Sequence, residues 1–550
     1  MSARIALMEL PLCLLLAAAL SGNGPAPDPP RSSRYEDLVS LFADWRSFQK
    51  PKLVDGVPDY TPAAMAAQRV ELETYRRRLA AIDPAGWPVQ QQVDWHLVRA
   101  EMNGLDFDHR VLQPWATNPA FYVTVFTEES DQPAREGPFA LGAVELWSYR
   151  SPLSPESAAE IGKGIRVIPA LLHQAKSNLT AGGRDLWVYG AKSLRQQSTD
   201  LAALASRLAA SGSPGALAAD VAMARKATDE LAAWVESQAH SKTGPSGVGI
   251  ENYDWYLKNV QLVPYTWREE VALMERELAR SQALLVMEEQ RNSNQPPLTP
   301  VADAEEYSRR FGAAVTEYMA FLKKHGILAV RAWMDGALRA RLGSYSPGPR
   351  EFFGEVDYRD PEVLRTHGYH WFDKKFLIYL PSPSPMRQGA LLYNIFNTRT
   401  EGHATGWEEL MMQAGMFDAR PRARELVYIL VAERAARALG ELRMHSNEMT
   451  LEQASAFACA HTPRGWLRMS GTLVRGEQHL YLQQPGYGTS YLIGKIEIEK
   501  LLDERRRQLG GQFSLPRFME EFNAAGLVPA SLLRWELTGH KSDELRRMLE

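Results

Sequence analysis

The segment TRTEGHATGWEELMMQAG, residues 398–415, carries the pattern from which we predict both the fold and the site. If this segment is helical, Glu401, Thr405, Glu408 and Met412 share one face, because offsets of 4, 7 and 11 residues return to nearly the same angle. Two carboxylates would then point in the same direction. The segment therefore predicts a helix with an acidic face suited to chemistry.

Two glycines on a neighbouring face indicate close packing against this helix. Gly402 and Gly406 lie one turn apart, where missing side chains allow a second helix or a ligand to approach. Glu401 also has a structural interpretation, since Thr398 to Glu401 has the form of a capping box. Both interpretations of Glu401 are compatible with its spacing.

A second helix is predicted over residues 421–444, and its composition is mostly apolar or rich in alanine. Arg434, Arg437, Glu441 and His445 fall at offsets of 0, 3, 7 and 11, so they form one polar stripe along it. The alternative is a solvent-exposed stripe, because opposite charges one turn apart are common on exposed helices.

Three motifs in this region resemble a known family, the bacterial domain-of-unknown-function 885 proteins. The family motif E-G-W-A-L-Y-A-E aligns with EGHATGWE at 401–408, and R-A-A-R-x-x-x-D-x-x-x-H resembles residues 434–445. The run P-G-x-x-x-S-Y-x-x-G-K matches residues 485–495. The likeness extends upstream through 94–111 and 252–257, so it covers most of the chain.

The resemblance implies a mainly α-helical, zincin-peptidase-like body with a central cleft and few short strands. It implies catalytic roles for Glu401 and Glu408, with Glu408 as the base, and for His445 or Tyr487 in stabilising an oxyanion. The candidate substrate-binding residues are His403, Arg434, Arg437, Glu441 and Tyr491.

The sequence departs from the family at the metal motif, H-E-x-x-P-G-H-H. None of the twelve histidines is followed by glutamate, so the chain has no HExxH-type helix. The corresponding position holds THGYHWFD, residues 366–373. His367 and His370, three residues apart, could face one metal ion with Glu401 and leave a coordination position open. We therefore predict zinc as the candidate cofactor, with a metal-free relative as the alternative.

Composition describes an ordinary soluble chain. Its 550 residues include 45% hydrophobic and 23% charged residues, and the formal net charge is −4. That charge gives no basic footprint for nucleic acid. Uniform composition and the resemblance favour one large helical domain over 34–550, and the break at 241–249 is compatible with lobes 34–240 and 250–550.

The N-terminus has the pattern of a secretory signal over residues 1–21, followed by a linker over 22–33. Arg4 precedes the apolar run 10–20, which is too short for an ordinary transmembrane helix. Cys13 would leave with the signal, and Cys459 would remain alone, so we expect no internal disulfide. The chain is therefore expected to be exported, periplasmic or secreted, without stable membrane insertion.

The remaining elements follow from periodicity, capping residues and breaks. We expect helices at 35–48, 61–83, 89–103, 155–177, 187–211, 214–240, 266–290 and 303–325, and further helices from about 450, about 491, 514 and 529. Residues 103–122 are interpreted as a loop. Short strands are predicted at 376–380 and 473–483.

The leading hypothesis is an exported hydrolase that resembles metallopeptidases and acts on peptide or small amide substrates. His367, His370 and Glu401 would hold the metal. The second hypothesis is a catalytically inactive relative that serves as a binding module, which loss of the H-E motif favours. The third is a metal-free acid/base enzyme that uses Glu401, Glu408 and His445.

Overall fold

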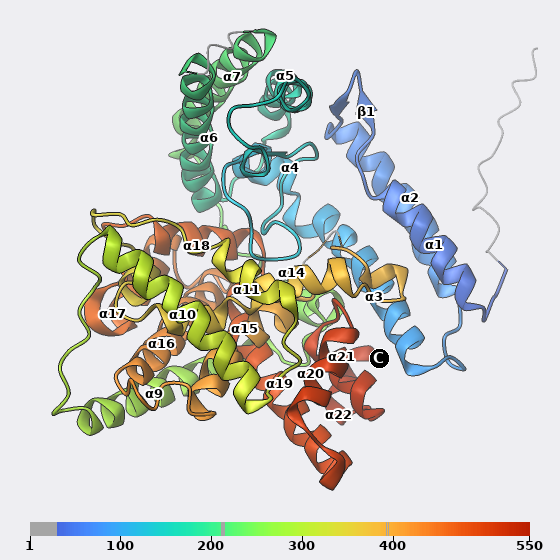
Figure 1. Ribbon diagram of the computed structural model, residues 1–550. Coiled ribbons are helices and arrows are strands. Elements are labelled where there is room, and N and C mark those ends of the chain that lie inside the picture. The colour runs from blue at the N-terminus through green and yellow to red at the C-terminus, as the bar shows by residue number, and fades with distance from the viewer. Residues whose placement is uncertain (1–29, 211–214, 392, 394) are drawn as a thin grey trace, which may run out of the picture.

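The computed structural model describes residues 30–210, 215–391, 393 and 395–550, and the predicted signal peptide lies outside them. The protein is mainly α-helical, as predicted, and its described strands are two residues long. Figure 1 shows three parts: a lobe of long helices, a pair of helices along one edge, and a large helical body.

The first part of the chain forms three helices and a short hairpin. The elements are α1 (Tyr35–Phe48), β1 (Leu53–Val54), β2 (Val57–Pro58), α2 (Pro62–Ala80) and α3 (Val89–Phe107). β1 and β2 pair antiparallel. Helices α1 and α2 lie side by side along one edge (Figure 1), where Tyr75 stacks on Phe48 with ring centroids 4.3 Å apart. Most of their buried apolar residues belong to the same hydrophobic cluster as the C-terminal body, whereas Met65 of α2 packs with the lobe described next.

The lobe in green in Figure 1 is built from three long helices with a core of their own. The elements of this region are α4 (Pro114–Thr117), β3 (Val125–Phe126), β4 (Val144–Glu145), α5 (Pro155–Asn178), α6 (Arg184–Ala210) and α7 (Ala216–Ala239). β3 and β4 pair in parallel, with Val125 opposite Val144. The residues between them, the 127–143 segment, leave this lobe and reach the site described below.

The body follows as a series of helices. They are α8 (Ile250–Tyr256), α9 (Trp267–Arg291), α10 (Ala304–His325), α11 (Ala332–Arg339), α12 (Phe352–Asp357), α13 (Pro361–His367), α14 (Tyr369–Tyr379), α15 (Asn397–Gln413), α16 (Ala423–His445), α17 (Leu451–His461), α18 (Leu473–Gln483), α19 (Tyr487–Leu509), α20 (Leu515–Ala524), α21 (Ala530–Thr538) and α22 (Asp543–Leu549). Capping boxes start α9 at Thr266 and α17 at Thr450, as expected from the sequence.

Helix α16 is the centre of the body, because nearly all of its residues are buried. The polar stripe predicted on this helix is buried as well, so the solvent-exposed alternative is wrong. A helix that buries charges needs partners for each of them. The surrounding helices provide those partners, which fixes how α15, α18 and α19 sit around α16.

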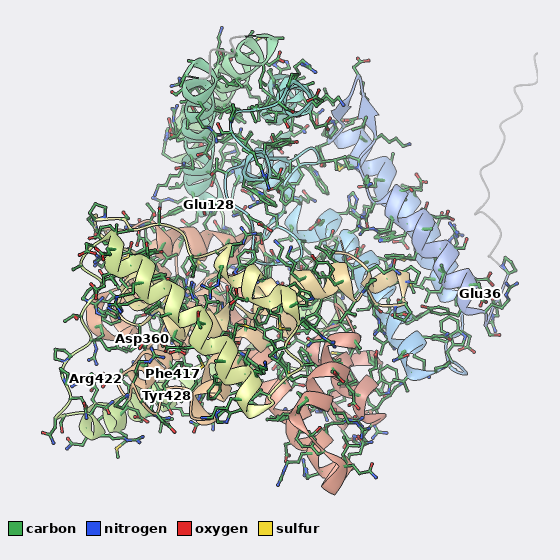
Figure 2. All side chains as sticks on the ribbon, viewed as in Figure 1. Glu36, Glu128, Asp360, Phe417, Arg422 and Tyr428 are labelled. Carbon is green, nitrogen blue, oxygen red and sulfur yellow. The ribbon has the colours of Figure 1, made fainter. Side chains whose placement is uncertain are left out.

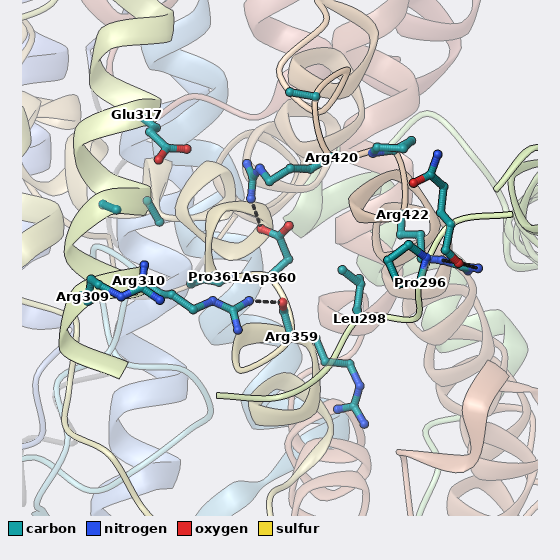
Figure 3. A pocket seen from close by; sticks show the side chains of 15 residues that line it. Pro296, Leu298, Arg309, Arg310, Glu317, Arg359, Asp360, Pro361, Arg420 and Arg422 are labelled. Carbon is teal, nitrogen blue, oxygen red and sulfur yellow. Dashed lines mark hydrogen bonds and ion pairs between the residues drawn. The ribbon is translucent and has the colours of Figure 1, made fainter. Parts of the chain in front are cut away.

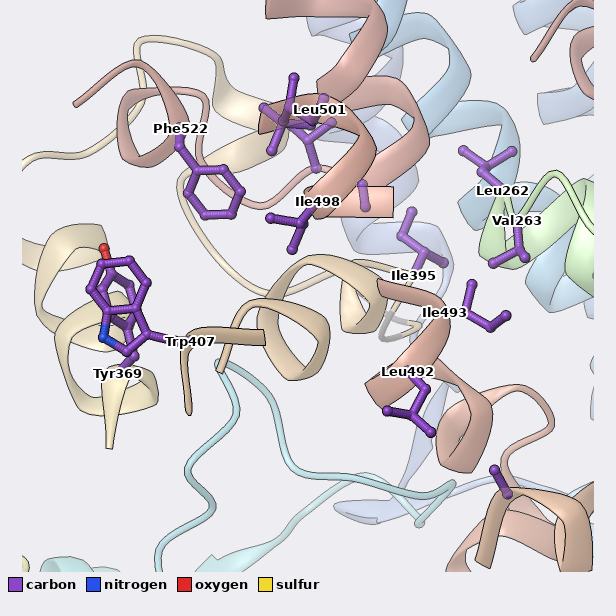
Figure 4. Packing of buried hydrophobic residues seen from close by; sticks show 14 of the residues in the cluster. Leu262, Val263, Tyr369, Ile395, Trp407, Leu492, Ile493, Ile498, Leu501 and Phe522 are labelled. Atoms are coloured by element: carbon purple, nitrogen blue, oxygen red, sulfur yellow. The ribbon is translucent and has the colours of Figure 1, made fainter. Parts of the chain in front are cut away.

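Helices α15 and α19 cross in close contact at two glycines. A Cβ atom added to Gly494 would overlap the carbonyl oxygen of Thr398, and one added to Gly402 would overlap the backbone of Gly494. This close approach is the one predicted from the missing side chain at Gly402. Apolar residues of the large hydrophobic cluster of the body, including Leu492, Ile493 and Trp407, pack around α15 and α19 (Figure 4).

Three secondary-structure predictions are wrong. Residues 376–380 belong largely to α14 and residues 473–483 form α18, so neither run is a strand. The 103–122 region is not a loop: α3 continues to Phe107, and π-helical, α-helical and 3₁₀ turns follow. Short apolar runs fit either a strand or a buried helix, and here helical packing decides.

Within the described residues, no helix combines the length and apolarity that crossing a membrane would require.

Candidate functional site

Four side chains from separate elements meet in a buried cluster. Nε2 of His370, from α14, lies 3.2 Å from Oε2 of Glu401, from α15. The other oxygen of Glu401 accepts hydrogen bonds from the Tyr487 hydroxyl (2.6 Å) and the Gln132 amide (2.8 Å). Glu401 lies within α15 and does not cap it, so the capping-box interpretation is wrong. His370, Glu401 and Tyr487, which the sequence analysis named as candidate site residues, thus lie together in the structure.

His367, at the end of α13, adds a second imidazole to this cluster. Its ring lies 4.9 Å from the ring of His370, centroid to centroid. Nδ1 of His367 is 3.0 Å from Oε1 of Glu408, and Arg434 donates to both oxygens of Glu408 at 2.7 and 2.8 Å. A carboxylate that holds one ring nitrogen of a histidine directs the other nitrogen. Glu408 is therefore a positioning group with both oxygens engaged, which does not favour the base role predicted for it.

The 127–143 segment supplies three residues that the sequence analysis did not name: Asp131, Gln132 and Glu136. One ligand atom from Asp131 lies within 4.8 Å of ligand atoms from His367 and His370. The amide of Gln132 contacts Nδ1 of His370 at 3.3 Å and accepts from the Thr400 hydroxyl at 2.7 Å. Glu128, near the start of this segment, lies at the junction between the green lobe and the body (Figure 2).

The same segment brings a further carboxyl group to Tyr487. The Tyr487 hydroxyl lies 3.4 Å from Glu136, in addition to its bond to Glu401. Desolvation and the nearby carboxylate of Asp131 raise the pKa of Glu136 to about 7. The acidic composition of residues 128–136 was a signal for such a site, but a polar loop between strands is usually only solvent-exposed.

Negative charge dominates the electrostatics of the cluster. Burial alone would lower the pKa of His370, yet the carboxylates of Asp131 and Glu401 raise it to about 9. Burial would raise the pKa of Glu401, but the facing histidine and the Tyr487 hydroxyl lower it to about 2. Carboxylates that stabilise a proton on His370 would also stabilise a metal cation there.

The donor set of this cluster fits a zinc ion. Two imidazoles and the carboxylates of Asp131 and Glu401 are ligand types that zinc accepts in tetrahedral sites. Nε2 of His370 and Oε2 of Glu401 are buried and make no hydrogen bond of good geometry, although they face each other. Buried polar atoms without partners are costly, and a cation between them would satisfy both. The residues therefore fit the metal that the resemblance implies.

Two further predicted residues, Arg437 and Tyr491, lie beside the cluster. The guanidinium group of Arg437 lies 5.6 Å from the Tyr491 ring centroid and pairs with Glu433 at 2.8 Å and with Glu477. Arg434 lies 5.8 Å from the same ring. Tyr491 is thus held beside both arginines, and all three residues are buried or nearly so. Their contacts are with the protein itself, so a substrate-binding role stays a prediction.

Two predicted residues are engaged elsewhere. Nε2 of His445 pairs with the carbonyl oxygen of Tyr481 at 3.1 Å, and Nδ1 accepts from the backbone N–H of Val248 at 3.4 Å. Glu441 accepts from the backbone N–H groups of Gly486 (2.5 Å) and Thr489 (3.0 Å) at the start of α19. The backbone N–H groups at this helix start are thus occupied by the protein's own carboxyl, and we do not include these two residues in the site.

His403 lies on another face of α15 from Glu401 and packs among aromatic rings. Its centroid is 4.2 Å from that of Tyr369, 4.6 Å from Phe522 and 5.1 Å from Trp407. Among the described residues, neither ring nitrogen has a hydrogen-bond partner, and burial holds the pKa of His403 well below the ordinary value. The structure therefore gives His403 a packing role and separates it from the cluster.

The protein also has an open pocket of about 370 Å³ next to α10 that shares no lining residue with the cluster. Figure 3 shows its arginines, and Arg420 pairs there with Asp360. Arg310 donates to the carbonyl oxygen of Arg359. Because Arg310 and Arg420 are already engaged within the protein, we do not take this pocket as the candidate site.

The structure thus defines a mainly helical protein with a buried cluster of histidines and carboxylates. Comparison with known proteins gives its family: the chain matches the family described as "Bacterial protein of unknown function (DUF885)" over residues 48–400 and 387–537. The chain belongs to this family, as the three motifs predicted. No curated protein matches it significantly.

Solved structures share this fold. One is a "putative lipoprotein of unknown function" from Shewanella oneidensis, with a TM-score of 0.65 and 16% identity over 94% of this chain and 98% of the other. Another is a "putative lipoprotein" from Colwellia psychrerythraea, with a TM-score of 0.61 and 17% identity over 92% and 97% of the two chains. At these identities the likeness concerns the fold alone, and neither description names an activity.

Proposed function

We propose that the protein is a metal-dependent hydrolase acting on peptide or small amide bonds. The observation that supports this proposal is the buried pairing of His370 with Glu401, beside possible ligand atoms of Asp131, His367 and His370 that lie within 4.8 Å of one another. Zinc bound there would supply Lewis acidity toward a carbonyl group and toward water. His367, His370 and Glu401 would hold it and leave a fourth position for substrate or water, while the carboxylate of Asp131 would add negative charge beside the ion.

The surrounding side chains have distinct tasks in this proposal. Tyr487 carries an O–H group beside Glu401, where it can donate to an oxyanion that develops on the substrate. Glu136, next to that hydroxyl, is placed to hold or release a proton. Glu408, fixed by Arg434, orients the imidazole of His367. Gln132 also contacts His370, through its amide nitrogen at Nδ1.

Two alternatives remain distinct from this proposal. A catalytically inactive relative would keep the cluster as a binding site. A metal-free enzyme was predicted to use Glu401, Glu408 and His445. Glu408 is held by Arg434, and His445 lies elsewhere. Such an enzyme would therefore pair Glu401 with Glu136 instead.

The binding-module alternative is favoured by the loss of the H-E motif. Glu401 and His370 are buried and contact Gln132 of the 127–143 segment, so a ligand or a substrate reaches them when this segment shifts.

Metal content tests the proposal. Purified protein, stripped by chelation and dialysed against zinc, should bind one zinc per chain, measured by mass spectrometry of the metal. His370→Ala and Glu401→Gln should each weaken zinc binding by more than about 100-fold, the largest effect usual for outer-sphere partners. His325→Ala, at an exposed histidine, is the matched control. Zinc binding that both site variants retain would reject the proposed ligands.

Hydrolysis separates the remaining cases. The zinc-loaded protein should cleave members of a fluorogenic dipeptide and amide panel, and Glu401→Gln should not. Cleavage without any bound metal would favour the acid/base enzyme. Zinc binding without cleavage would favour the binding module.

Export is the last part of the proposal. It rests on the signal-like pattern of residues 1–21 and on two structural neighbours described as "putative lipoprotein". Fractionation of the producing cells, followed by mass spectrometry of the N-terminus, tests this: a mature form that lacks about 21 residues is expected in the exported fraction.

A further inference from the structure

A cavity of about 340 Å³ lies where α1, α2, α3 and the 127–143 segment meet. Its volume is in the range of about 300–1,000 Å³ that is usual for small-molecule sites. Six aromatic side chains line it, namely Tyr60, Trp115, Phe121, Phe139, Tyr256 and Tyr393. Such walls favour an aromatic or large aliphatic group.

The cavity also contains polar atoms without partners. Nη1 of Arg46 is buried and makes no hydrogen bond with any residue that the structure describes, while Nη2 donates to the carbonyl oxygen of Ala390 at 3.1 Å. Oε1 of Gln49 is likewise unpaired, and this residue is 8% exposed. In the described part of the chain, no carboxylate forms an ion pair with Arg46. An uncompensated guanidinium group in an aromatic cavity favours an anionic ligand.

The other charged groups around the cavity do not neutralise Arg46. Lys50 is exposed at the rim, and Arg135 pairs with Glu145 at 2.6 Å. Asp108, the one carboxyl among the lining residues, accepts from the Tyr393 hydroxyl at 2.7 Å, and desolvation raises its pKa to about 7. The lining therefore has an excess of positive charge.

The cavity and the cluster lie on two sides of one wall. The cluster is reached by Asp131, Gln132 and Glu136 of the 127–143 segment. The cavity is lined by residues 134, 135 and 137 of the same segment, which lie between or next to them in the sequence. The backbone N–H of Gly137 donates to Gln484 at 2.7 Å, and Gln484 also lines the cavity. A ligand in the cavity thus lies against the same segment that completes the cluster.

We propose that this cavity selects the substrate of the candidate centre by holding an aromatic or large aliphatic residue that carries a free carboxylate, while a shift of the 127–143 segment lets the adjoining bond reach the cluster. This substrate class corresponds to the C-terminal residue of a short peptide or to an N-acylated amino acid. The six aromatic side chains contact its apolar part, and Arg46 pairs with its carboxylate. The assignment to a substrate rests on the proposed hydrolase function, whereas the binding itself does not.

Calorimetry with the full chain tests the inference, with N-acetyl-L-phenylalanine and its uncharged carboxamide as probes. The acid should bind at least about tenfold more tightly than the carboxamide, because a charge-assisted hydrogen bond is roughly twice as strong as a neutral one. Arg46→Gln should abolish that preference. Lys52→Gln, at an exposed lysine outside the cavity, should preserve it.

A second variant tests the cavity without changing its charge. Leu141→Trp adds bulk to the wall and should weaken binding of both probes, and circular dichroism checks that each variant is folded. Equal binding of acid and carboxamide to the wild type, no binding of either probe, or an unchanged preference in Arg46→Gln would overturn the inference.

The two proposals can fail separately. In His370→Ala the acid should still bind in the cavity. If zinc binding fails while probe binding follows Arg46, the hydrolase proposal is wrong and the cavity assignment stands. If zinc binds and Arg46→Gln leaves the preference for the acid unchanged, the cavity assignment is wrong and the hydrolase proposal stands.

Discussion

Nε2 of His370 lies 3.2 Å from Oε2 of Glu401, although the two residues come from different helices. This contact joins α14 to α15, and the Tyr487 hydroxyl joins α19 to the same carboxylate. Each of the three helices contributes one side chain to this buried contact, so the cluster depends on how α14, α15 and α19 pack. The predictions below separate groups that form the site from groups that hold its frame.

Glu408 should tune metal affinity without binding the metal. Glu408→Gln keeps the shape of the side chain but weakens its hold on Nδ1 of His367, so zinc affinity should fall by about 10- to 100-fold. A competition titration with a chromophoric chelator measures this change. The exposed-site control Glu305→Gln should leave the affinity unchanged. An unchanged affinity in Glu408→Gln would show that Glu408 does not orient a ligand.

Arg434 should be needed for stability, because it neutralises Glu408 in a buried position. Arg434→Met leaves that carboxylate uncompensated and should lower the free energy of unfolding by about 3–5 kcal/mol. The double variant Arg434→Met with Glu408→Gln should recover part of the loss, since the unpaired charge is gone. Urea unfolding of the three variants measures both effects, and a double variant as unstable as Arg434→Met would contradict the charge argument.

The crossing of α15 and α19 should not tolerate a methyl group. Gly494→Ala places a Cβ against the carbonyl oxygen of Thr398, so overpacking should cost about 1–3 kcal/mol or more. Gly476, on α18, has open space around it and provides the control, since Gly476→Ala should not destabilise the protein. Thermal unfolding compares the two. Equal melting temperatures would show that the helices can separate without loss.

The sequence predicted the parts of the site that helical spacing determines. Glu401 and Tyr487 belong to two of the family motifs, and these motifs lie on helices α15 and α19. The missing side chain at Gly402 indicated that another helix approaches α15 closely. Asp131, Gln132 and Glu136 were missed, because they reach the cluster from a segment more distant in sequence, and no local pattern encodes that contact.

The inclusion of His445 shows the limit of a spacing argument. A residue on the same helix face as Arg434 need not point to the same site, because α16 is buried on all sides. His445 satisfies backbone groups near the end of α16, and Glu441 satisfies the start of α19. A buried polar stripe can therefore serve several separate structural contacts.

His445 should accordingly affect stability and leave metal binding unchanged. His445→Ala leaves the carbonyl oxygen of Tyr481 unpaired and should cost about 1–3 kcal/mol. The zinc affinity of the folded variant should equal that of the wild type, in contrast to His370→Ala. Parallel urea unfolding and zinc titration distinguish the two histidines. A loss of zinc affinity in His445→Ala would return this residue to the site.

The buried carboxyl groups Glu270 and Glu441 should make the protein less stable as pH rises. The Tyr253 hydroxyl lies 3.1 Å from Glu441 and 3.4 Å from Glu270, and burial raises the pKa of Glu441 to about 8. Burial and the charge of Glu441 also raise the pKa of Glu270. Both groups hold protons in the folded state that the unfolded chain releases at a lower pH.

Their contribution to stability is therefore fully present below the ordinary carboxyl pKa and is lost as pH rises through about 8. Glu270→Gln removes one of the two acids and keeps a partner for Tyr253, so the decline between pH 5 and pH 8 should become shallower. Urea midpoints across this range measure the slope, with Glu275→Gln as an exposed control on the same helix. A slope that Glu270→Gln leaves unchanged would show that Glu270 does not hold a proton in the folded state that the unfolded chain releases.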